Sequence, residues 1–202
     1  MPTYNAAMHR KIFFIFLLLV VFARIVFAQS PGASQPRDCR IQPEQLANIL
    51  SLSFMKFDQD QAGGWRVLAD QGCRIEAVLL INAWLAYAPP ELTELEKGDL
   101  YFHAGQLLAM TGENRLAAEY MLRSLNPQEP TDADLAWNAY VLSTVAFLSG
   151  DRPRLEFQRS ELAAGKQTRE NKINLSVVDG LRQCYGKPYE QAYGSACRPV
   201  AK

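Results

Sequence analysis

Apolar side chains recur at intervals of three and four residues along most of this 202-residue chain, which places them on one face of an α-helix. The first helix is expected to begin at Pro43, because proline is favoured in the first helical turn; Leu46, Ile49, Leu50 and Phe54 form its apolar face. No segment alternates apolar and polar residues long enough to make a convincing strand. The pattern predicts an all-α fold, with further helices over 65–70, 75–87, 94–110, 116–125, 134–148, 155–164 and 173–185.

Three glycines, Gly72, Gly112 and Gly150, separate pairs of these helices at intervals of 40 and 38 residues. A glycine can end a helix with a positive φ, so each is predicted to be the turn of a helix hairpin. Five residues after each glycine comes a small or apolar residue at which the second helix is expected to cross the first: Ala77, Ala117 and Leu155. A helix–turn–helix unit repeated at this period is typical of a helical solenoid.

The unit at 101–127 has an aromatic start, a small-residue pair, a turn glycine, two packing residues and a closing proline: Tyr101, Ala104, Gly105, Gly112, Ala117, Met121 and Pro127. In these features it resembles the tetratricopeptide repeat family. The resemblance covers residues 61–165 with degenerate repeats, and the spacing exceeds the family's usual period of about 34 residues. It implies stacked antiparallel helix hairpins, a short α-solenoid, and a concave groove that binds peptides or proteins.

A short helix is predicted near the C-terminus, where Pro188 begins it and Gly194 ends it. Tyr189, Ala192 and Tyr193 share one of its sides. A terminal repeat needs a cap over its exposed apolar face. This segment is therefore predicted to be a C-terminal capping helix.

Residues 1–28 combine a basic patch, an apolar run over 12–23 and an exit with Ala28 at the expected cleavage position. This combination predicts a signal peptide cleaved after Ala28. The apolar run is shorter than the roughly 20 residues that a membrane span needs, and no later run is long enough to cross a bilayer. We expect a flexible linker over 29–41, a single helical-repeat domain over 42–198, and a periplasmic or secreted mature protein.

Four cysteines in an exported chain predict two disulfides, although sequence alone allows three pairings. Pairing between neighbouring elements favours Cys39–Cys73 and Cys184–Cys197.

The net charge and the residue types present limit the functions that the chain can have. The chain has 21 basic and 21 acidic residues, and the leader holds three basic residues and no acid, so the mature chain is close to −3. This balance argues against a general nucleic-acid binder, which needs a positive surface. His103 is the only histidine after the leader and is interpreted as a packing or partly exposed residue, because it falls among Phe102, Ala104 and Leu107. Zinc needs three or four ligands, which one histidine and oxidised cysteines cannot supply. No catalytic residue, metal or cofactor is predicted.

Aromatic side chains are the candidate binding residues. Trp137, Tyr140 and Thr144 share a helical face, and the resemblance places them with Phe102 and Gln106 on the groove-facing helices. Aromatic side chains in a groove would anchor an extended peptide or an apolar ligand. The alternative is that the stripe is the core between hairpins, and the sequence leaves this choice open.

The leading hypothesis is a non-enzymatic scaffold or assembly module that binds a protein or peptide of unknown identity. One alternative is a small cell-envelope hydrolase acting through carboxylates, a mechanism that needs only two of them. Its candidate acids stand at predicted helix starts, where the helix dipole also favours negative charge: Glu91, Glu94, Glu96, Asp132 and Asp134. The other alternative is a carrier that holds an apolar small molecule between hairpins.

Overall fold

A computed structural model describes residues 38–87 and 89–199. These residues form helices and connecting loops without a β-strand, which confirms the predicted all-α class. In chain order the elements are α1 (Pro43–Leu50), the single-turn π-helix η1 (Met55–Gln59), α2 (Arg66–Asp70), α3 (Arg74–Ala86), α4 (Glu94–Met110), α5 (Asn114–Leu122), α6 (Trp137–Leu148), α7 (Arg152–Ala164), α8 (Arg169–Gln183), α9 (Tyr189–Tyr193) and the 3₁₀ turn η2 (Ser195–Cys197).

Three hairpins follow one another along the chain, α2–α3, α4–α5 and α6–α7, and each turns at one of the predicted glycines. Gly72, Gly112 and Gly150 have φ values of 80°, 89° and 70°, in the left-handed region that favours glycine. At each turn, the N–H of the residue after the glycine donates to a carbonyl five residues earlier; Glu113 to Leu108 is one example, at 3.0 Å. This Schellman bond closes the end of the first helix and directs the chain into the second.

Small residues set the distance between the paired helices. Ala77 and Ala117 are fully buried at the crossings, and so is Leu155 in the third hairpin. A Cβ atom at Gly105 would lie 2.6 Å from the Cγ atom of Met121, so only glycine lets α4 and α5 pack this closely. The two helices of the α4–α5 hairpin therefore approach each other where the sequence places small side chains.

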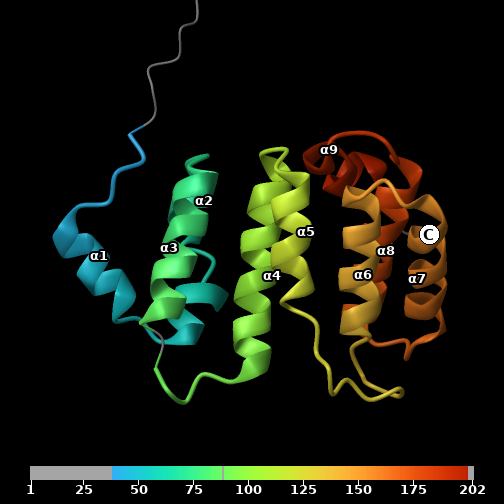
Figure 1. Ribbon diagram of the computed structural model, residues 1–202, viewed down its shortest axis with the longest axis horizontal. Coiled ribbons are helices and arrows are strands. Elements are labelled where there is room, and N and C mark those ends of the chain that lie inside the picture. The colour runs from blue at the N-terminus through green and yellow to red at the C-terminus, as the bar shows by residue number, and fades with distance from the viewer. Residues whose placement is uncertain (1–37, 88, 200–202) are drawn as a thin grey trace, which may run out of the picture. The chain divides into compact units, whose positions relative to one another are not determined.

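The hairpins stack in chain order, as Figure 1 shows: α3 packs on α4, and α5 packs on α6. Helix α8 packs against both α6 and α7, and α9 packs on α8 and returns to α4. This arrangement of neighbouring hairpins is the predicted solenoid-like fold. Within the described residues, no helix combines the length and apolar character that a membrane crossing requires.

Helix α6 begins at Trp137, three residues later than predicted. The cause is Glu129, whose carboxylate accepts hydrogen bonds from the N–H groups of Trp137 and Asn138 at 2.6 and 2.8 Å. An acid from the preceding loop thus caps the start of α6.

Two disulfides join the ends of the fold to its body, in the pairing favoured from the sequence. Cys39 before α1 is bonded to Cys73 at the start of α3, and Cys184 at the end of α8 is bonded to Cys197 in η2. The predicted signal peptide at 1–28 and most of the predicted linker at 29–41 lie outside the described residues.

Candidate functional site

The predicted aromatic stripe lies between hairpins. The Phe102 ring from α4 contacts the rings of Trp137 and Tyr140 from α6, with centroids 4.9 and 5.2 Å apart. Phe102, Tyr140 and Thr144 are buried, whereas Trp137 and Gln106 are partly exposed. The stripe is thus core rather than open groove.

Helix α9 covers this stripe. Tyr189 is buried and packs on Phe147 of α6, with ring centroids 6.2 Å apart. Burial also raises the pKa of the Tyr140 hydroxyl, and the neighbouring tyrosines of α9 add to that effect. An ion pair between Glu190 and Arg74 connects α9 to the start of α3. The chain itself therefore occupies the surface on which the five predicted binding residues were expected. Their binding role stays a prediction.

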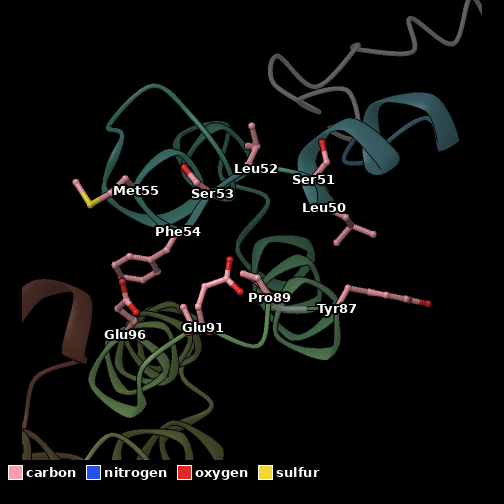
Figure 2. Close-up of a pocket in the computed structure, with 11 residues that line it drawn as sticks. Leu50, Ser51, Leu52, Ser53, Phe54, Met55, Tyr87, Pro89, Glu91 and Glu96 are labelled. Atoms are coloured by element: carbon pink, nitrogen blue, oxygen red, sulfur yellow. The ribbon is translucent and has the colours of Figure 1, made fainter.

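An open cleft, called here the N-terminal cleft, lies elsewhere, between the α1–η1 segment and the α3–α4 connection (Figure 2). Its volume is about 550 Å³. Apolar and acidic side chains dominate the lining, which consists of Leu50, Ser51, Leu52, Ser53, Phe54, Met55, Tyr87, Pro89, Glu91, Leu92 and Glu96. The Met55 and Tyr87 side chains lie at opposite ends of the cleft in Figure 2 and are 64% and 73% exposed. Two large apolar side chains are therefore exposed to solvent at the rim of one cleft.

The floor of the cleft rests on the core. The carbonyl oxygen of Leu52 accepts a hydrogen bond from the indole N–H of Trp84 at 3.2 Å. Trp84 in turn stacks on Phe57 with centroids 4.7 Å apart. Because both rings are buried, the segment that carries Phe54 and Met55 is held on a packed support.

Negative charge lies on the side of the cleft formed by the α3–α4 connection. Glu96 accepts hydrogen bonds from the backbone N–H and the hydroxyl of Thr93, at 2.9 and 2.8 Å. These bonds lower the pKa of Glu96, so its carboxylate stays ionised at neutral pH. Glu91 also lies on this side of the cleft, where it is exposed, and in Figure 2 the Phe54 ring points toward Glu96.

The other candidate acids make local structural contacts. Glu94 pairs with Lys97 at 2.7 Å in the first turn of α4, and Asp134 pairs with Lys166 at 2.8 Å. Asp132 is exposed in the loop before α6. Apart from Glu91 and Glu96, these acids do not gather at one place.

A second cluster of chemically capable groups joins η1 to α4. The Asp58 carboxylate is fully buried and lies 2.8 Å from the Nδ1 atom of His103. It also accepts hydrogen bonds from the indole N–H of Trp65 at 2.9 Å and from the Gln59 amide at 2.6 Å. Asp99, one helical turn before His103, is partly buried on the same helix.

The pKa values of the two acids in this cluster are shifted in opposite directions. Burial favours a neutral Asp58, but the hydrogen bonds from His103 and Trp65 and the charge of Arg66 outweigh burial and lower its pKa. An ionised Asp58 accepts the hydrogen bond from the Nδ1–H group of His103. Burial raises the pKa of Asp99 to about 6, and the negative charges of Asp58 and Glu96 act in the same direction.

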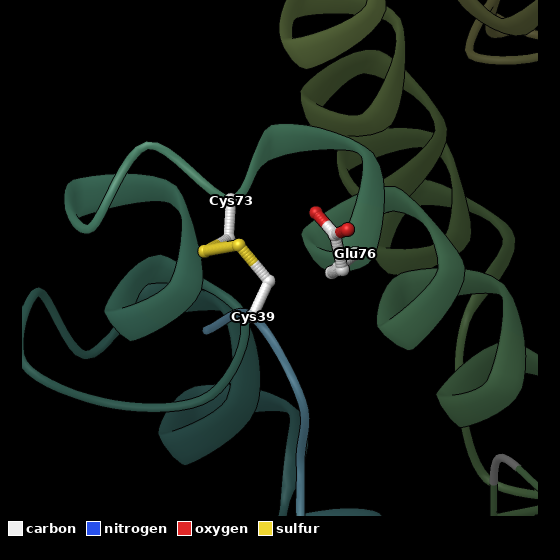
Figure 3. A group of neighbouring side chains, drawn as sticks. All are labelled: Cys39, Cys73 and Glu76. Carbon is white, nitrogen blue, oxygen red and sulfur yellow. A yellow bond between two sulfur atoms is a disulfide. The ribbon is translucent and has the colours of Figure 1, made fainter. Parts of the chain in front are cut away.

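Glu76 lies close to Cys39 and Cys73, which gives this corner the composition of a metal site (Figure 3). The two sulfur atoms are bonded to each other, however, and a metal binds cysteine as a free thiolate. The disulfide removes the donors that such a site requires.

The sequence indicated the acids of the N-terminal cleft, Glu91 and Glu96, but not its apolar residues. The sequence pattern placed Phe54 at the end of a helical apolar face and Tyr87 at the end of a helix, and it assigned no role to Met55. Their position where helices end was the available signal, because an apolar side chain at a helix end has fewer neighbours to cover it.

Comparisons of the chain with protein-family models, with curated proteins and with solved structures give no match.

Proposed function

We propose that this chain is a non-enzymatic, peptide-binding module of a tetratricopeptide-like kind that works in an oxidising compartment, either the periplasm or the cell exterior. The three glycine-turned hairpins support the repeat assignment. The two disulfides support the compartment, since such bonds persist where thiols are not kept reduced. The predicted signal peptide is consistent with export to either location.

The N-terminal cleft is the proposed peptide site. The observation that carries the proposal is the exposure of Met55 and Tyr87 at the two ends of a cleft whose floor is fixed by the core. Methionine and tyrosine supply adaptable and amphipathic contact area, and both are enriched in protein interfaces. Such a surface fits an extended segment that inserts apolar side chains.

The two acids indicate that the partner carries positive charge. Glu91 and Glu96 stand together along one side of the cleft. Peptides that place Lys or Arg beside an apolar side chain would complement both the apolar floor and the acidic side of the cleft. The proposed partner is therefore an apolar and basic peptide segment.

A phage-displayed peptide library, selected on the oxidised mature chain, tests the proposal. We expect enriched sequences with Leu, Phe or Met next to Lys or Arg, and calorimetry should give a dissociation constant at least tenfold weaker for Met55→Asp and for Glu91→Lys. Leu116→Asp is the matched control, because Leu116 is an exposed apolar residue on α5 outside the cleft. Selected peptides that bind all of these variants equally would overturn the assignment of the cleft.

A further inference from the structure

Positive charge is concentrated in the last third of the chain. Residues 151–199 contain nine Lys or Arg and six Asp or Glu, whereas residues 38–150 contain seven and fifteen. The excess of basic residues therefore lies on α7, α8 and the C-terminal segment, at the opposite end of the sequence from the N-terminal cleft. An overall charge close to zero conceals this division.

Part of this charge surrounds one hollow, called here the α8 hollow, with a volume of about 500 Å³. Its lining contains three basic residues and no acid: Arg169, Lys172, Ile173, Ser176 and Arg198. The first four follow helical spacing on one face of α8. Gly180 continues that face, and a Cβ atom there would lie 3.3 Å from the Cγ atom of Arg198. The missing side chain lets the C-terminal segment lie against α8 and bring Arg198 to the hollow.

Arg198 is held in place by its surroundings. Its Nε and Nη2 atoms donate to the carbonyl oxygen of Tyr193 at 3.3 and 3.1 Å, and its guanidinium lies 5.1 Å from the centre of the Tyr193 ring. The residue before it, Cys197, is fixed by the disulfide to Cys184. The remaining nitrogen, Nη1, is not used by these bonds. A positioned guanidinium loses little conformational entropy when it binds an anion.

The other two cations have no acidic partner within the part of the chain that the structure describes. Neither Arg169 nor Lys172 forms an ion pair there. By contrast, Arg159 and Arg182 nearby pair with Asp179 and Glu156, at 2.9 and 2.7 Å. Like charges one helical turn apart repel each other, and an anion between them relieves that repulsion.

The donor types indicate which anion. Arg and Lys together bind phosphate through several N–H groups, and the Ser176 hydroxyl adds a neutral donor. Arg169 begins α8, so the positive end of the helix dipole contributes in the same direction. Ile173 is 49% exposed at the hollow, which offers apolar contact to the carbon part of an organic phosphate.

We propose that the α8 hollow binds the phosphate group of an organic phosphate, either a small soluble ester or the headgroup of an anionic lipid. The site is separate from the N-terminal cleft and independent of peptide binding. It assigns a second ligand to the basic end of the molecule.

Two binding measurements on the oxidised mature chain test this proposal. The first titrates the protein with glycerol phosphate in a calorimeter, and the second sediments it with vesicles of phosphatidylglycerol or of phosphatidylcholine. Binding to the soluble ester without sedimentation on phosphatidylglycerol identifies a free phosphate ligand. Sedimentation with phosphatidylglycerol alone, without binding of the soluble ester, identifies a lipid headgroup. In either case binding should weaken as salt is raised.

Charge reversal distinguishes the hollow from basic surface in general. We expect at least tenfold weaker binding for Arg169→Glu and for Lys172→Glu, and less than a twofold change for Arg154→Glu, an exposed residue of α7 outside the hollow. Circular dichroism and melting temperature control for folding. The proposal is overturned if neither probe binds, or if Arg154→Glu weakens binding as much as the two variants in the hollow.

Discussion

The fully buried Asp58 carboxylate and the partly exposed His103 imidazole join the first hairpin region to the second through a contact of 2.8 Å. The Trp65 indole and the Gln59 amide donate to the same carboxylate, so three side chains are positioned by one acid. A fully buried charge is tolerated only when its hydrogen bonds are satisfied, which is the case here. The contact therefore acts as a polar connection between η1 and α4.

Removing the Asp58 carboxylate should destabilise the fold. Asp58→Ala leaves the buried indole N–H group of Trp65 without its acceptor and removes the contact to the partly exposed His103, and the free energy of unfolding should fall by about 2 to 3 kcal/mol. Urea denaturation followed by circular dichroism measures the change. Asp134→Ala is the control, since its ion pair with Lys166 lies on the surface and should leave the urea midpoint almost unchanged. Similar midpoints for the two variants would show that the buried contact does not stabilise the fold.

Asp99 should give the protein an unusual pH dependence. Its pKa is about 6 in the folded chain, against about 3.9 in an unfolded one, so the native state holds the proton more tightly. The stabilisation is complete below about pH 4 and is lost as pH rises through 6. Asp58 behaves in the opposite way, because its lowered pKa gives stability that is lost on acidification.

The variant Asp99→Asn isolates this effect, since it removes the ionisation and keeps the shape. At pH 8 it should be more stable than the parent by up to about 2 kcal/mol, and at pH 4 the two should be nearly equal. Unfolding free energies measured in urea at several pH values give the comparison. A difference that stays constant from pH 4 to pH 8 would contradict the raised pKa.

The sequence was sufficient to predict the repeated local features of this fold. Gly72, Gly112 and Gly150 were recognisable because each turn needs only a positive φ between two periodic apolar segments. The disulfide pairing followed from the adjacency of the elements that the cysteines flank. Such signals are local, so a single sequence contains them.

Features that depend on distant parts of the chain were not predicted. The C-terminal segment was predicted to be a capping helix, but nothing near Tyr140 in sequence indicates that α9, about fifty residues later, also returns to α4. The contact between Asp58 and His103 spans 45 residues and has no spacing pattern. The N-terminal cleft was missed for the same reason, because two separate connections form it.

Gly64 and Gly112 are required for different reasons. Gly112 forms the turn of a hairpin, whereas Gly64 leaves room for the backbone of Phe57. The φ of Gly64 is 52°, and a Cβ atom there would lie only 1.8 Å from the carbonyl oxygen of Phe57. At Gly112, by contrast, nothing lies within 4 Å of a Cβ atom, so a side chain would meet only the cost of a positive φ. Gly112→Ala should destabilise the fold by about 1 to 2 kcal/mol and Gly64→Ala by more than about 3 kcal/mol. Urea midpoints rank the two variants, and an equal loss would contradict the close approach at Gly64.

The C-terminal disulfide should hold α9 over the aromatic stripe. Cys184 and Cys197 are 13 residues apart and enclose Tyr189, whose buried ring packs on α6. Replacing both cysteines by serine frees a short loop and should cost about 3 kcal/mol of stability. Because the ion pair of Glu190 with Arg74 lies at the surface, it is too weak to keep α9 docked by itself.

Hydrogen exchange read by mass spectrometry tests where that stability is lost. In the Cys184→Ser/Cys197→Ser variant, amides of 189–197 should exchange much faster while those of α4 and α6 remain protected, since local opening requires only that α9 detach. The matched Cys39→Ser/Cys73→Ser variant should lose protection around α1 and keep it at 189–197. If 189–197 remain as protected in the first variant as in the parent, packing of Tyr189 alone holds the cap, and the disulfide is dispensable for covering Tyr140.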